Sequence, residues 1–333
     1  MIKLAFVGLG WWGNELAIAA SKLATDISIS GCHSLSESEM DSFAEKFKAR
    51  IFQNYDQILS DSEIDSVVLS TPHSLHADQI IQATNAGKHV FVEKPLALTV
   101  ADAKAAATCS SDNNVVLAVG HNRRFSAVAQ ELANWVKAEK FGQILHVEAH
   151  FSGNSAMKFE PDNWRANRTD SPAGSLVSIG LHMIDTIQWL LGPIDRLSCI
   201  SKRQALSVDI EDTTAALFEL ESGVTGTLGT LFATPQNSYL RIYGTKGIAE
   251  TRDDFSTLSW TTSPSSSQQQ MIPEENTLIA ELQAFARACD GKIDYPVSPQ
   301  EAINNVAVIE AMKVSSQNDN QWVSVSTGES PSS

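Results

Sequence analysis

The chain has 333 residues, of which 43% are hydrophobic and 19% are charged, and its formal net charge is −15. This length exceeds the usual size of a single hydrophobic core and predicts two domains. The acidic balance argues against nucleic acid or an anionic membrane as a partner, and no apolar run is long enough to cross a membrane. The four cysteines are far apart, which favours reduced thiols and a cytoplasmic location.

The first 120 residues alternate between short β-rich runs and helical stretches. Strands are predicted at Leu4–Val7, Ile27–Cys32, Val67–Leu69, His89–Val92 and Val115–Val119. Helices are predicted at Asn14–Leu23, Glu39–Lys48, Ala77–Ala86 and Val100–Ser110. Strands that alternate with helices of this length indicate a parallel sheet with helices on both faces. Residues 1–121 are therefore predicted to form a doubly wound α/β domain.

The pattern changes in the rest of the chain. A helix is predicted at Ala127–Glu139, a strand at Gln143–Phe151 and a helix at Leu181–Leu191. Strands follow at Leu197–Ser201, Thr214–Leu220, Val224–Leu231, Tyr239–Tyr243 and Thr257–Thr261, then helices at Asn276–Cys289 and Pro299–Ser315. Consecutive strands joined by turn residues indicate an open, mainly antiparallel sheet. Residues 122–333 are therefore predicted to form a second α/β domain.

A glycine motif lies where the first strand meets the first helix. Gly8, Gly10 and Gly13 form G-x-G-x-x-G directly after the apolar strand. In a dinucleotide-binding loop these glycines permit the turn, admit the pyrophosphate and let the helix pack on the sheet. Trp11 and Trp12 fill the variable positions; we expect Trp12 to face the nicotinamide side and Trp11 to pack toward an interdomain surface. The motif predicts a Rossmann dinucleotide-binding domain.

The residue that reads the adenosine ribose should stand at the end of the second strand. A carboxylate there favours NAD, whereas a nearby arginine accommodates the 2′-phosphate of NADP. This strand ends in His33-Ser34, with no acid at the tip and no arginine or lysine after it. Ser34 could hydrogen-bond either form, and a protonated His33 could face a phosphate. The sequence therefore does not decide between NAD and NADP.

Two further segments carry a family resemblance. Thr71, Pro72 and His76 form T-P-x-x-x-H, and residues 86–95 read A-G-K-H-V-F-V-E-K-P. With the glycine loop, these segments closely resemble the glucose–fructose oxidoreductase, inositol dehydrogenase and rhizopine-catabolism oxidoreductase family (Gfo/Idh/MocA). The resemblance continues through the segments 120–125, 163–165 and 173–185 and spans most of the chain.

The resemblance implies a Rossmann domain followed by an α/β domain whose open sheet often forms the interface of a homo-dimer or homo-tetramer. It also implies hydride transfer between NAD or NADP and a hydroxyl-bearing carbon of a small molecule: a sugar, polyol, sugar acid or cyclic diol. The expected cofactor-binding residues are Gly8, Gly10, Trp11, Trp12, Gly13, Ser34, Thr71, Pro72, His76, Glu93 and Lys94.

Lys94 follows the fourth predicted strand, at the edge where open parallel sheets bind ligands. Oxidation of an alcohol requires removal of the hydroxyl proton, and burial or a neighbouring positive charge lowers the pKa of a lysine toward neutrality. By the resemblance, Lys94 is catalytic and also binds substrate, and His182 supplies the acid/base function opposite it. Pro95 fixes the backbone after the lysine and is a candidate for a cis bond.

The chain departs from the family pattern four residues before His182. Many relatives have an aspartate there, whereas this chain has Ser178, which cannot hold a negative charge. Residues four apart on a helix share a face, so the proton relay is expected to be weaker or differently wired. Asp185 could be a replacement partner, although a structural role is favoured for it.

Arg123, Trp164 and Arg165 are further candidates on the substrate side, together with Lys94, Ser178 and His182. Arginine binds carboxylates in bidentate fashion, and an aromatic plane stacks on a sugar ring. Interdomain ion pairs are the competing explanation for both arginines.

Alternatives to a dehydrogenase stay open. No metal is expected, because His146 and His150 would lie about 13 Å apart along a straight strand. A glycosidase of the same fold would keep NAD bound through oxidation, elimination and reduction, and a non-catalytic sensor is a third possibility. Net formation of NADH or NADPH would distinguish the dehydrogenase from both.

Overall fold

The computed structural model describes residues 1–263, 266, 268–270, 272–273 and 275–328, and it divides into two compact units. The first comprises Met1–Ala97, Ala101–Asn122 and Asn276–Ala302; the second comprises Leu98–Val100, Arg123–Glu275 and Ile303–Ser333. The predicted domain boundary after residue 121 stays a prediction. The compact units differ from it by joining residues 276–302 to the N-terminal part of the chain.

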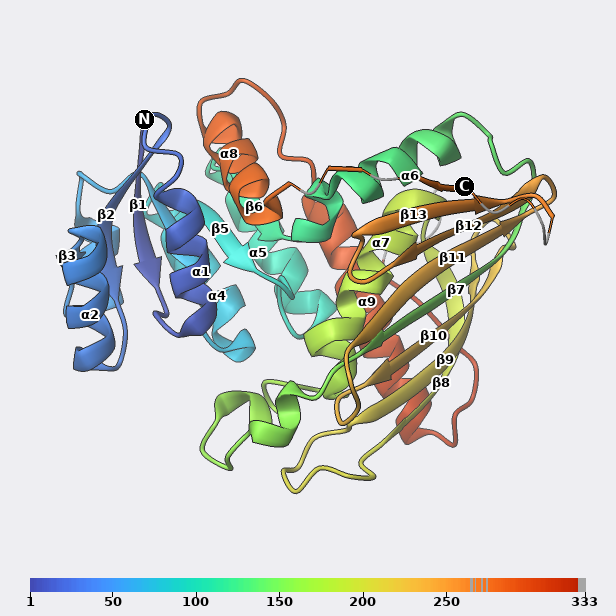
Figure 1. Ribbon diagram of the computed structural model, residues 1–333. Coiled ribbons are helices and arrows are strands. Elements are labelled where there is room, and N and C mark those ends of the chain that lie inside the picture. The colour runs from blue at the N-terminus through green and yellow to red at the C-terminus, as the bar shows by residue number, and fades with distance from the viewer. Residues whose placement is uncertain (264–265, 267, 271, 274, 329–333) are drawn as a thin grey trace. The chain divides into compact units, whose positions relative to one another are not determined.

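The first unit is built on a six-stranded parallel sheet with the order β3-β2-β1-β4-β5-β6 (Figure 1). Its strands are β1 (Ile2–Val7), β2 (Ile27–His33), β3 (Arg50–Ile51), β4 (Ser66–Leu69), β5 (His89–Glu93) and β6 (Leu117–Gly120). Its helices are α1 (Trp11–Ala20), α2 (Glu37–Phe47), α3 (Tyr55–Ser60), α4 (His76–Asn85), α5 (Val100–Asp112) and α8 (Thr277–Cys289). The apolar central strands are buried, as in a sheet covered on both faces, and the predicted Rossmann fold is confirmed.

The second unit is built on a nine-stranded sheet with the order β14-β13-β12-β11-β7-β10-β9-β8-β15. In chain order the strands are β7 (Ile144–Ser152), β8 (Ile194–Lys202), β9 (Thr213–Leu220), β10 (Thr225–Leu231), β11 (Asn237–Gly244), β12 (Gly247–Arg252), β13 (Thr257–Thr261), β14 (Gln268–Gln270) and β15 (Val323–Ser324). Strands β7 and β10 pair in parallel, and the other pairs are antiparallel. The predicted mainly antiparallel sheet is confirmed.

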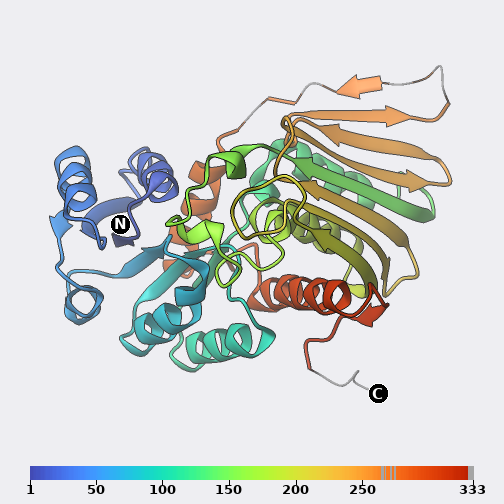
Figure 2. The same ribbon diagram turned by 90° about the horizontal axis from the view of Figure 1, so that it is seen from below.

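The two faces of the nine-stranded sheet differ. Helices α6 (Ala127–Lys137), α7 (Leu181–Leu191) and α9 (Pro299–Gln317) pack on one face, where residues of β7 such as Val147 join their apolar core (Figure 1). His146, Glu148 and His150 alternate onto the other face. No helix of the described residues covers that second face (Figure 2). The sheet is therefore open on one side, as predicted.

The cysteines and the helices bear on location and chemistry. Cys32, Cys109, Cys199 and Cys289 are free thiols. Burial raises the pKa of Cys32 to about 11 and those of Cys199 and Cys289 to about 12, so these three thiols stay protonated at neutral pH. Within the described ranges, no helix has both the length and the apolar character that a membrane crossing requires. The same residues contain no group of three or more His, Cys, Asp or Glu suited to a metal ion.

Candidate functional site

The glycine loop between β1 and α1 forms a cradle in which each glycine meets different surroundings. Gly8 has a φ of +87°, and a Cβ there would lie 2.7 Å from the carbonyl oxygen of Ser70. A Cβ on Gly13 would lie 2.2 Å from the carbonyl oxygen of Gly8, so only glycine lets α1 approach the loop. A Cβ on Gly10 would meet nothing within 4 Å. The open space at Gly10, beside the N-terminus of α1, fits the pyrophosphate of a dinucleotide.

Two side chains brace this cradle. Ser70, which follows β4, donates its hydroxyl to the carbonyl oxygen of Gly8 at 2.6 Å. Asn14 of α1 donates Nδ2 to the carbonyl oxygen of Leu9 at 2.7 Å. The loop is therefore held in its conformation by hydrogen bonds of its own unit.

The two tryptophans of the loop differ in their surroundings. Trp11 is 73% exposed, and its packing toward an interdomain surface stays a prediction. Trp12 is half-buried, and the two rings lie 5.2 Å apart. The indole N–H of Trp12 is buried and has no acceptor among the described residues. A buried donor without a partner beside the glycine cradle is a second feature that suits a polar ligand at this loop.

The second strand ends beside the glycine cradle. The Gly8 N–H donates to the carbonyl oxygen of His33 at 3.0 Å. This bond joins the glycine loop to the end of β2, and Ser34 is the next residue of the chain. The Ser34 hydroxyl donates to Oε2 of Glu39 at 2.5 Å and accepts the N–H of Ser36 at 3.3 Å. The charged group at this position is therefore the Glu39 carboxylate, from the first turn of α2. Glu39 was not predicted from the sequence, although the capping pattern of Ser36 and Glu39 could have indicated it.

His76 links the segments that follow β4 and β5. Its ring is fully buried, with Nδ1 2.8 Å from the carbonyl oxygen of Pro95 and Nε2 3.1 Å from that of Thr71. Pro72, which follows Thr71, leads into the short helix η1 (His73–Leu75). The Lys94–Pro95 peptide bond is cis. His76 thus holds the two segments together, while its contact with a cofactor stays a prediction.

Lys94 follows β5 and is half-buried. Glu93 is 8% exposed and accepts the Lys94 N–H at 3.3 Å. A Cβ on Gly120 of β6 would lie 2.9 Å from Oε1 of Glu93, so the Glu93 carboxylate packs closely on the neighbouring strand. All strands of this sheet are parallel, so their carboxyl ends share one edge. The candidates that follow those ends are Gly8, Ser34, Thr71 and Lys94.

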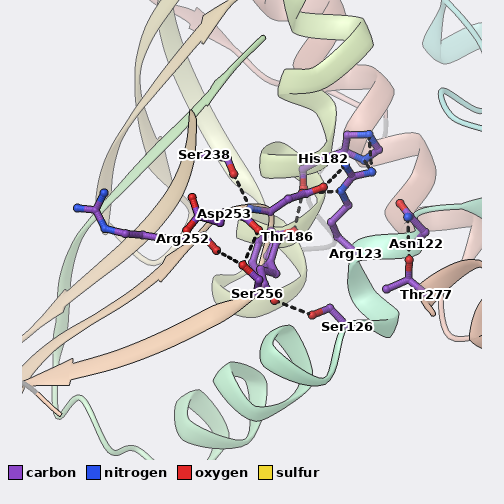
Figure 3. Close-up of polar contacts among 12 residues, drawn as sticks. Asn122, Arg123, Ser126, His182, Thr186, Ser238, Arg252, Asp253, Ser256 and Thr277 are labelled. Carbon is purple, nitrogen blue, oxygen red and sulfur yellow. Dashed lines mark hydrogen bonds and ion pairs between the residues drawn. The ribbon is translucent and has the colours of Figure 1, made fainter. Parts of the chain in front are cut away.

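In the second unit, His182 lies at the start of α7 and Arg123 contacts its ring (Figure 3). Nη1 of Arg123 lies 3.0 Å from Nε2 and 3.4 Å from Nδ1 of His182. Arg123 also donates two hydrogen bonds to Asp254, from Nε at 3.0 Å and from Nη2 at 2.7 Å. Arg123, predicted on the substrate side, is thus engaged within its own unit. Asp254 belongs to no motif and lies 131 residues from Arg123, so it was not predicted from the sequence.

Asp254 lies in a turn between β12 and β13 that has an unusual backbone. Asp253, Asp254 and Phe255 have φ values of 51°, 54° and 64°, in the left-handed region that non-glycine residues rarely adopt. Such conformations cost on the order of 1–3 kcal/mol each unless surrounding contacts hold them. The Asp254 N–H donates to Oγ of Ser238 at 2.6 Å, and Ser126 donates to the carbonyl oxygen of Phe255 at 3.3 Å. Figure 3 shows Ser238 and Ser126 beside Asp253 and Ser256 of this turn.

A neighbouring ion pair is fully buried. The side chains of Arg124 and Asp185 are 2% and 1% exposed and share two hydrogen bonds of 2.9 and 2.7 Å. Asn305 of α9 donates a further bond to Asp185 at 2.7 Å. A carboxylate that accepts three bonds in the core ties α7 to α9 and to Arg124. These contacts support the structural role favoured for Asp185.

The remaining candidates lie in the chain before α7. Ser178 belongs to the π-helix η5 (Leu176–Gly180), and α7 begins only at Leu181. The α-helical spacing assumed between Ser178 and His182 is therefore wrong, because a π-helix has a wider turn. Trp164 and Arg165 lie in the short helix η4 (Trp164–Ala166), where the Arg165 guanidinium stacks 4.0 Å from the centre of the Trp164 ring.

Sequence profiles of one known family match most of the chain. The profile described as "Oxidoreductase family, NAD-binding Rossmann fold" matches residues 2–121. The profile described as "GFO/IDH/MocA C-terminal domain" matches residues 129–250. The chain belongs to the GFO/IDH/MocA family of oxidoreductases. This membership confirms the predicted family and the predicted NAD-binding Rossmann fold.

Other GFO/IDH/MocA proteins resemble the chain in sequence and fold. Glucose-6-phosphate 3-dehydrogenase of Bacillus subtilis is 27% identical over 57% of this chain and 54% of that protein. D-xylose 1-dehydrogenase (NADP(+)) 2 of Haloferax volcanii is 24% identical over 80% of this chain and 82% of that protein. A levoglucosan dehydrogenase solved in complex with NADH and L-sorbose has a TM-score of 0.89 at 21% identity, over 98% of this chain and 99% of that one.

The sequence matches and the structural match differ in how much of each relative they cover. The matched region spans about half the length of several of the curated relatives. The structural likeness at 21% identity shows the shared fold.

Proposed function

We propose that this member of the GFO/IDH/MocA family is an NAD(P)-dependent dehydrogenase or reductase. Its substrate would be a sugar, polyol, sugar acid or cyclic diol with a reacting hydroxyl-bearing carbon. The observation that carries the proposal is the glycine cradle, which follows the strands at the same sheet edge as Lys94. The sugar dehydrogenases among the relatives support a sugar-like substrate.

The chain's own residues would hold the dinucleotide and handle the proton. The bound dinucleotide would supply the hydride acceptor or donor. Lys94 would hydrogen-bond the reacting oxygen, and His182 would accept the hydroxyl proton in the oxidative direction and return it in the reductive one. The Trp164 and Arg165 stack would contact the rest of the substrate. The residues that would hold the dinucleotide are Gly8, Gly10, Trp12, Gly13, Ser34, Thr71, Pro72 and Glu93.

A screen of turnover tests the proposed activity. D-xylose, levoglucosan, glucose 6-phosphate and inositol would be offered with NAD and with NADP while the nicotinamide absorbance is followed. Net formation of NADH or NADPH, matched by an equal amount of oxidised sugar, is expected. Turnover without net reduction of the nucleotide, or dinucleotide binding without turnover of any candidate, would contradict the proposal.

We also infer that the cofactor is NAD rather than NADP. Ser34 donates its hydroxyl to Glu39, and no lysine or arginine lies in residues 34–38. Leu35, the next residue, is apolar and 99% exposed. A carboxylate at this position would accept a hydrogen bond from a ribose 2′-OH and would repel a 2′-phosphate.

Affinities for the two nucleotides test this preference. NADH and NADPH would be titrated against the intrinsic tryptophan fluorescence, and NADH is expected to bind about 10-fold more tightly or better. Glu39→Gln should reduce this ratio about 10-fold, because it removes a charge-assisted hydrogen bond and a repulsion. Glu37→Gln changes the same charge in the same helical turn and should leave the ratio within about twofold. Equal affinities in the wild-type protein would refute the preference.

We propose that the chain assembles through the open face of the nine-stranded sheet and resides in the cytoplasm. Ile200 and Leu217 lie on that face and are each 46% exposed. Exposed apolar side chains on a face without helices are typical of an interface. The four free thiols support a reducing compartment. Sedimentation of the wild-type protein as a monomer at micromolar concentration would contradict the proposed assembly.

A further inference from the structure

A chain of contacts leads from the β12–β13 turn to the imidazole of His182. Asp254 in the turn binds Arg123 through two hydrogen bonds of 3.0 and 2.7 Å. Arg123 in turn places Nη1 at 3.0 Å from Nε2 and 3.4 Å from Nδ1 of His182 (Figure 3). All three side chains belong to the second unit.

The contact between Arg123 and His182 determines which form of the ring is favoured. Because Nη1 lies within 3.4 Å of both ring nitrogens, it lies over the face of the imidazole and not along the lone pair of either nitrogen. A doubly protonated ring would place a second positive charge against the guanidinium. This geometry therefore suits a neutral imidazole, which is the form that can accept a proton from a substrate hydroxyl.

A second ion pair lies in the same unit as His182. Arg124 and Asp185 neutralise each other in a buried bidentate pair, and Asp185 also accepts a bond from Asn305. On β7 the ring that faces His182 is Phe151, with ring centres 6.3 Å apart. His146, Glu148 and His150 of the same strand point to the other face of the sheet. Among the contacts described above, those of Arg123 and Asp254 bring charge to the His182 ring.

The position of Arg123 depends on the turn. An arginine side chain is flexible, so a single contact with His182 would not hold its guanidinium in place. Asp254 supplies a bidentate anchor, and its own backbone is held in the left-handed region by the hydrogen bond from its N–H to Ser238. The turn, with its three consecutive left-handed residues, thus directs the carboxylate of Asp254 toward the guanidinium of Arg123. Backbone outliers of this kind cluster at functional sites.

We propose that Asp254 and Arg123 are positioning residues that keep His182 neutral and oriented as the proton acceptor. The inference rests on the role of His182 in the proposed function. In the oxidative direction the substrate O–H bond breaks and its proton passes to His182. The C–H bond would break as its hydride, with both electrons, passes to the oxidised nicotinamide that a bound dinucleotide would supply, and a C=O bond would form. The cation beside the ring then favours release of the proton to solvent.

The first test is a spectroscopic titration of the free protein. NMR of protein labelled with ¹⁵N-histidine reports the protonation of each ring, and His182→Gln assigns the His182 signals. Arg123→Gln keeps an N–H donor but removes the charge, and it should raise the pH midpoint of the His182 titration by about one unit or more. An unchanged midpoint would overturn the proposal. The titration needs neither nucleotide nor sugar, so its failure is separate from a failure of the proposed activity.

The second test compares two adjacent aspartates by steady-state kinetics, with a sugar that the turnover screen shows to be oxidised. Asp254→Asn should lower kcat about 10-fold or more with little change in KM, because the proton acceptor loses its orientation. Asp253→Asn is the matched control: it changes the same charge in the same turn and tolerates the left-handed backbone. Its kcat should stay within about twofold of wild type.

A third variant separates positioning from folding. Asp254→Glu retains the carboxylate on a longer side chain and should recover part of the kcat that Asp254→Asn loses. Thermal unfolding of the three variants should show similar midpoints. Equal loss of kcat in Asp253→Asn and Asp254→Asn would mean that the turn acts on stability alone, and the proposal would fall.

Discussion

The two units hold their candidate residues by different means. In the first unit, backbone geometry positions the candidate residues. Gly8, Gly10 and Gly13 shape the cradle, and the ends of the parallel strands place it at the same sheet edge as Lys94. In the second unit, long-range side-chain contacts hold the candidate, as Asp254 and Arg123 hold His182. Short motifs encode the first kind of site, whereas contacts across more than a hundred residues encode the second.

The largest expected effect is that of replacing Lys94 in the first unit. Lys94→Met should lower kcat about 10³-fold or more, because methionine can neither hydrogen-bond the reacting oxygen nor move its proton. Dinucleotide affinity should stay within about threefold, since the cradle is formed by other residues. Steady-state kinetics and fluorescence titration measure the two quantities.

The exposed Lys22 of the same unit provides the control for that substitution. Lys22→Met should leave both kcat and dinucleotide affinity near their wild-type values. A Lys94→Met enzyme with most of its activity would show that the chemistry lies elsewhere in the molecule.

A pair of glycine variants sharpens the idea that backbone space forms the cradle. Gly13→Ala should lower the free energy of unfolding by about 3 kcal/mol, because its Cβ would lie 2.2 Å from the Gly8 carbonyl oxygen. Gly10→Ala should cost less than about 1 kcal/mol, since its Cβ would meet nothing within 4 Å. It should nevertheless weaken NADH binding about 10-fold or more. Urea unfolding and NADH titration separate the two effects, and the reverse pattern would rule out this placement of the pyrophosphate.

The smallest expected effect concerns Asp212, a side chain that stabilises the second unit through hydrogen bonds to the backbone. Oδ2 of Asp212 accepts the N–H groups of Gln204, Ala205 and Leu206 at 2.9, 2.7 and 2.9 Å. Burial alone would raise the pKa of Asp212, but these backbone hydrogen bonds outweigh it and hold the pKa below its usual 3.8. Asp212→Asn should therefore lower the free energy of unfolding at pH 7 by about 1–3 kcal/mol.

The pH dependence of that effect has a definite sign. A carboxyl group whose folded pKa is depressed stabilises the fold above its unfolded pKa of about 3.9, and this contribution is lost as the pH falls through the folded pKa. The stability difference between wild type and Asp212→Asn should thus shrink below about pH 4. Urea unfolding at pH 7, 5 and 3 measures it, with the exposed Asp209→Asn as control. A constant difference across this range would show that the carboxylate charge plays no part.

Much of the first unit was predictable because its constraints are local. The spacing of Gly8, Gly10 and Gly13 after an apolar strand predicted both the fold and the cradle. Glu39 was not predicted beside Ser34, because the reach of a side chain from α2 back to Ser34 depends on how the helix packs.

The second unit was predictable in its sheet but not in its polar contacts. Consecutive strand-like segments joined by turn residues predicted the antiparallel sheet, yet nothing in the sequence marks Asp254 as the partner of Arg123. The π-helix at Ser178 was also missed, because its winding is set by tertiary packing: a Cβ on Gly180 would lie 2.7 Å from the side chain of Thr230. Helix α8 joins the first unit for a similar reason, since the Phe285 ring packs 5.7 Å from that of Phe91.

The chain between β7 and β8 forms a long connection outside the nine-stranded sheet. An excursion leaves the sheet after Ser152 and returns at Ile194 of β8, and both ends are anchored in strands of one sheet. Trp164, Arg165 and His182 all lie within it. Insertions or deletions near Trp164 would change the length of this excursion without shifting the register of any strand pair. Substrate preference could therefore diverge between relatives while the sheet stays the same.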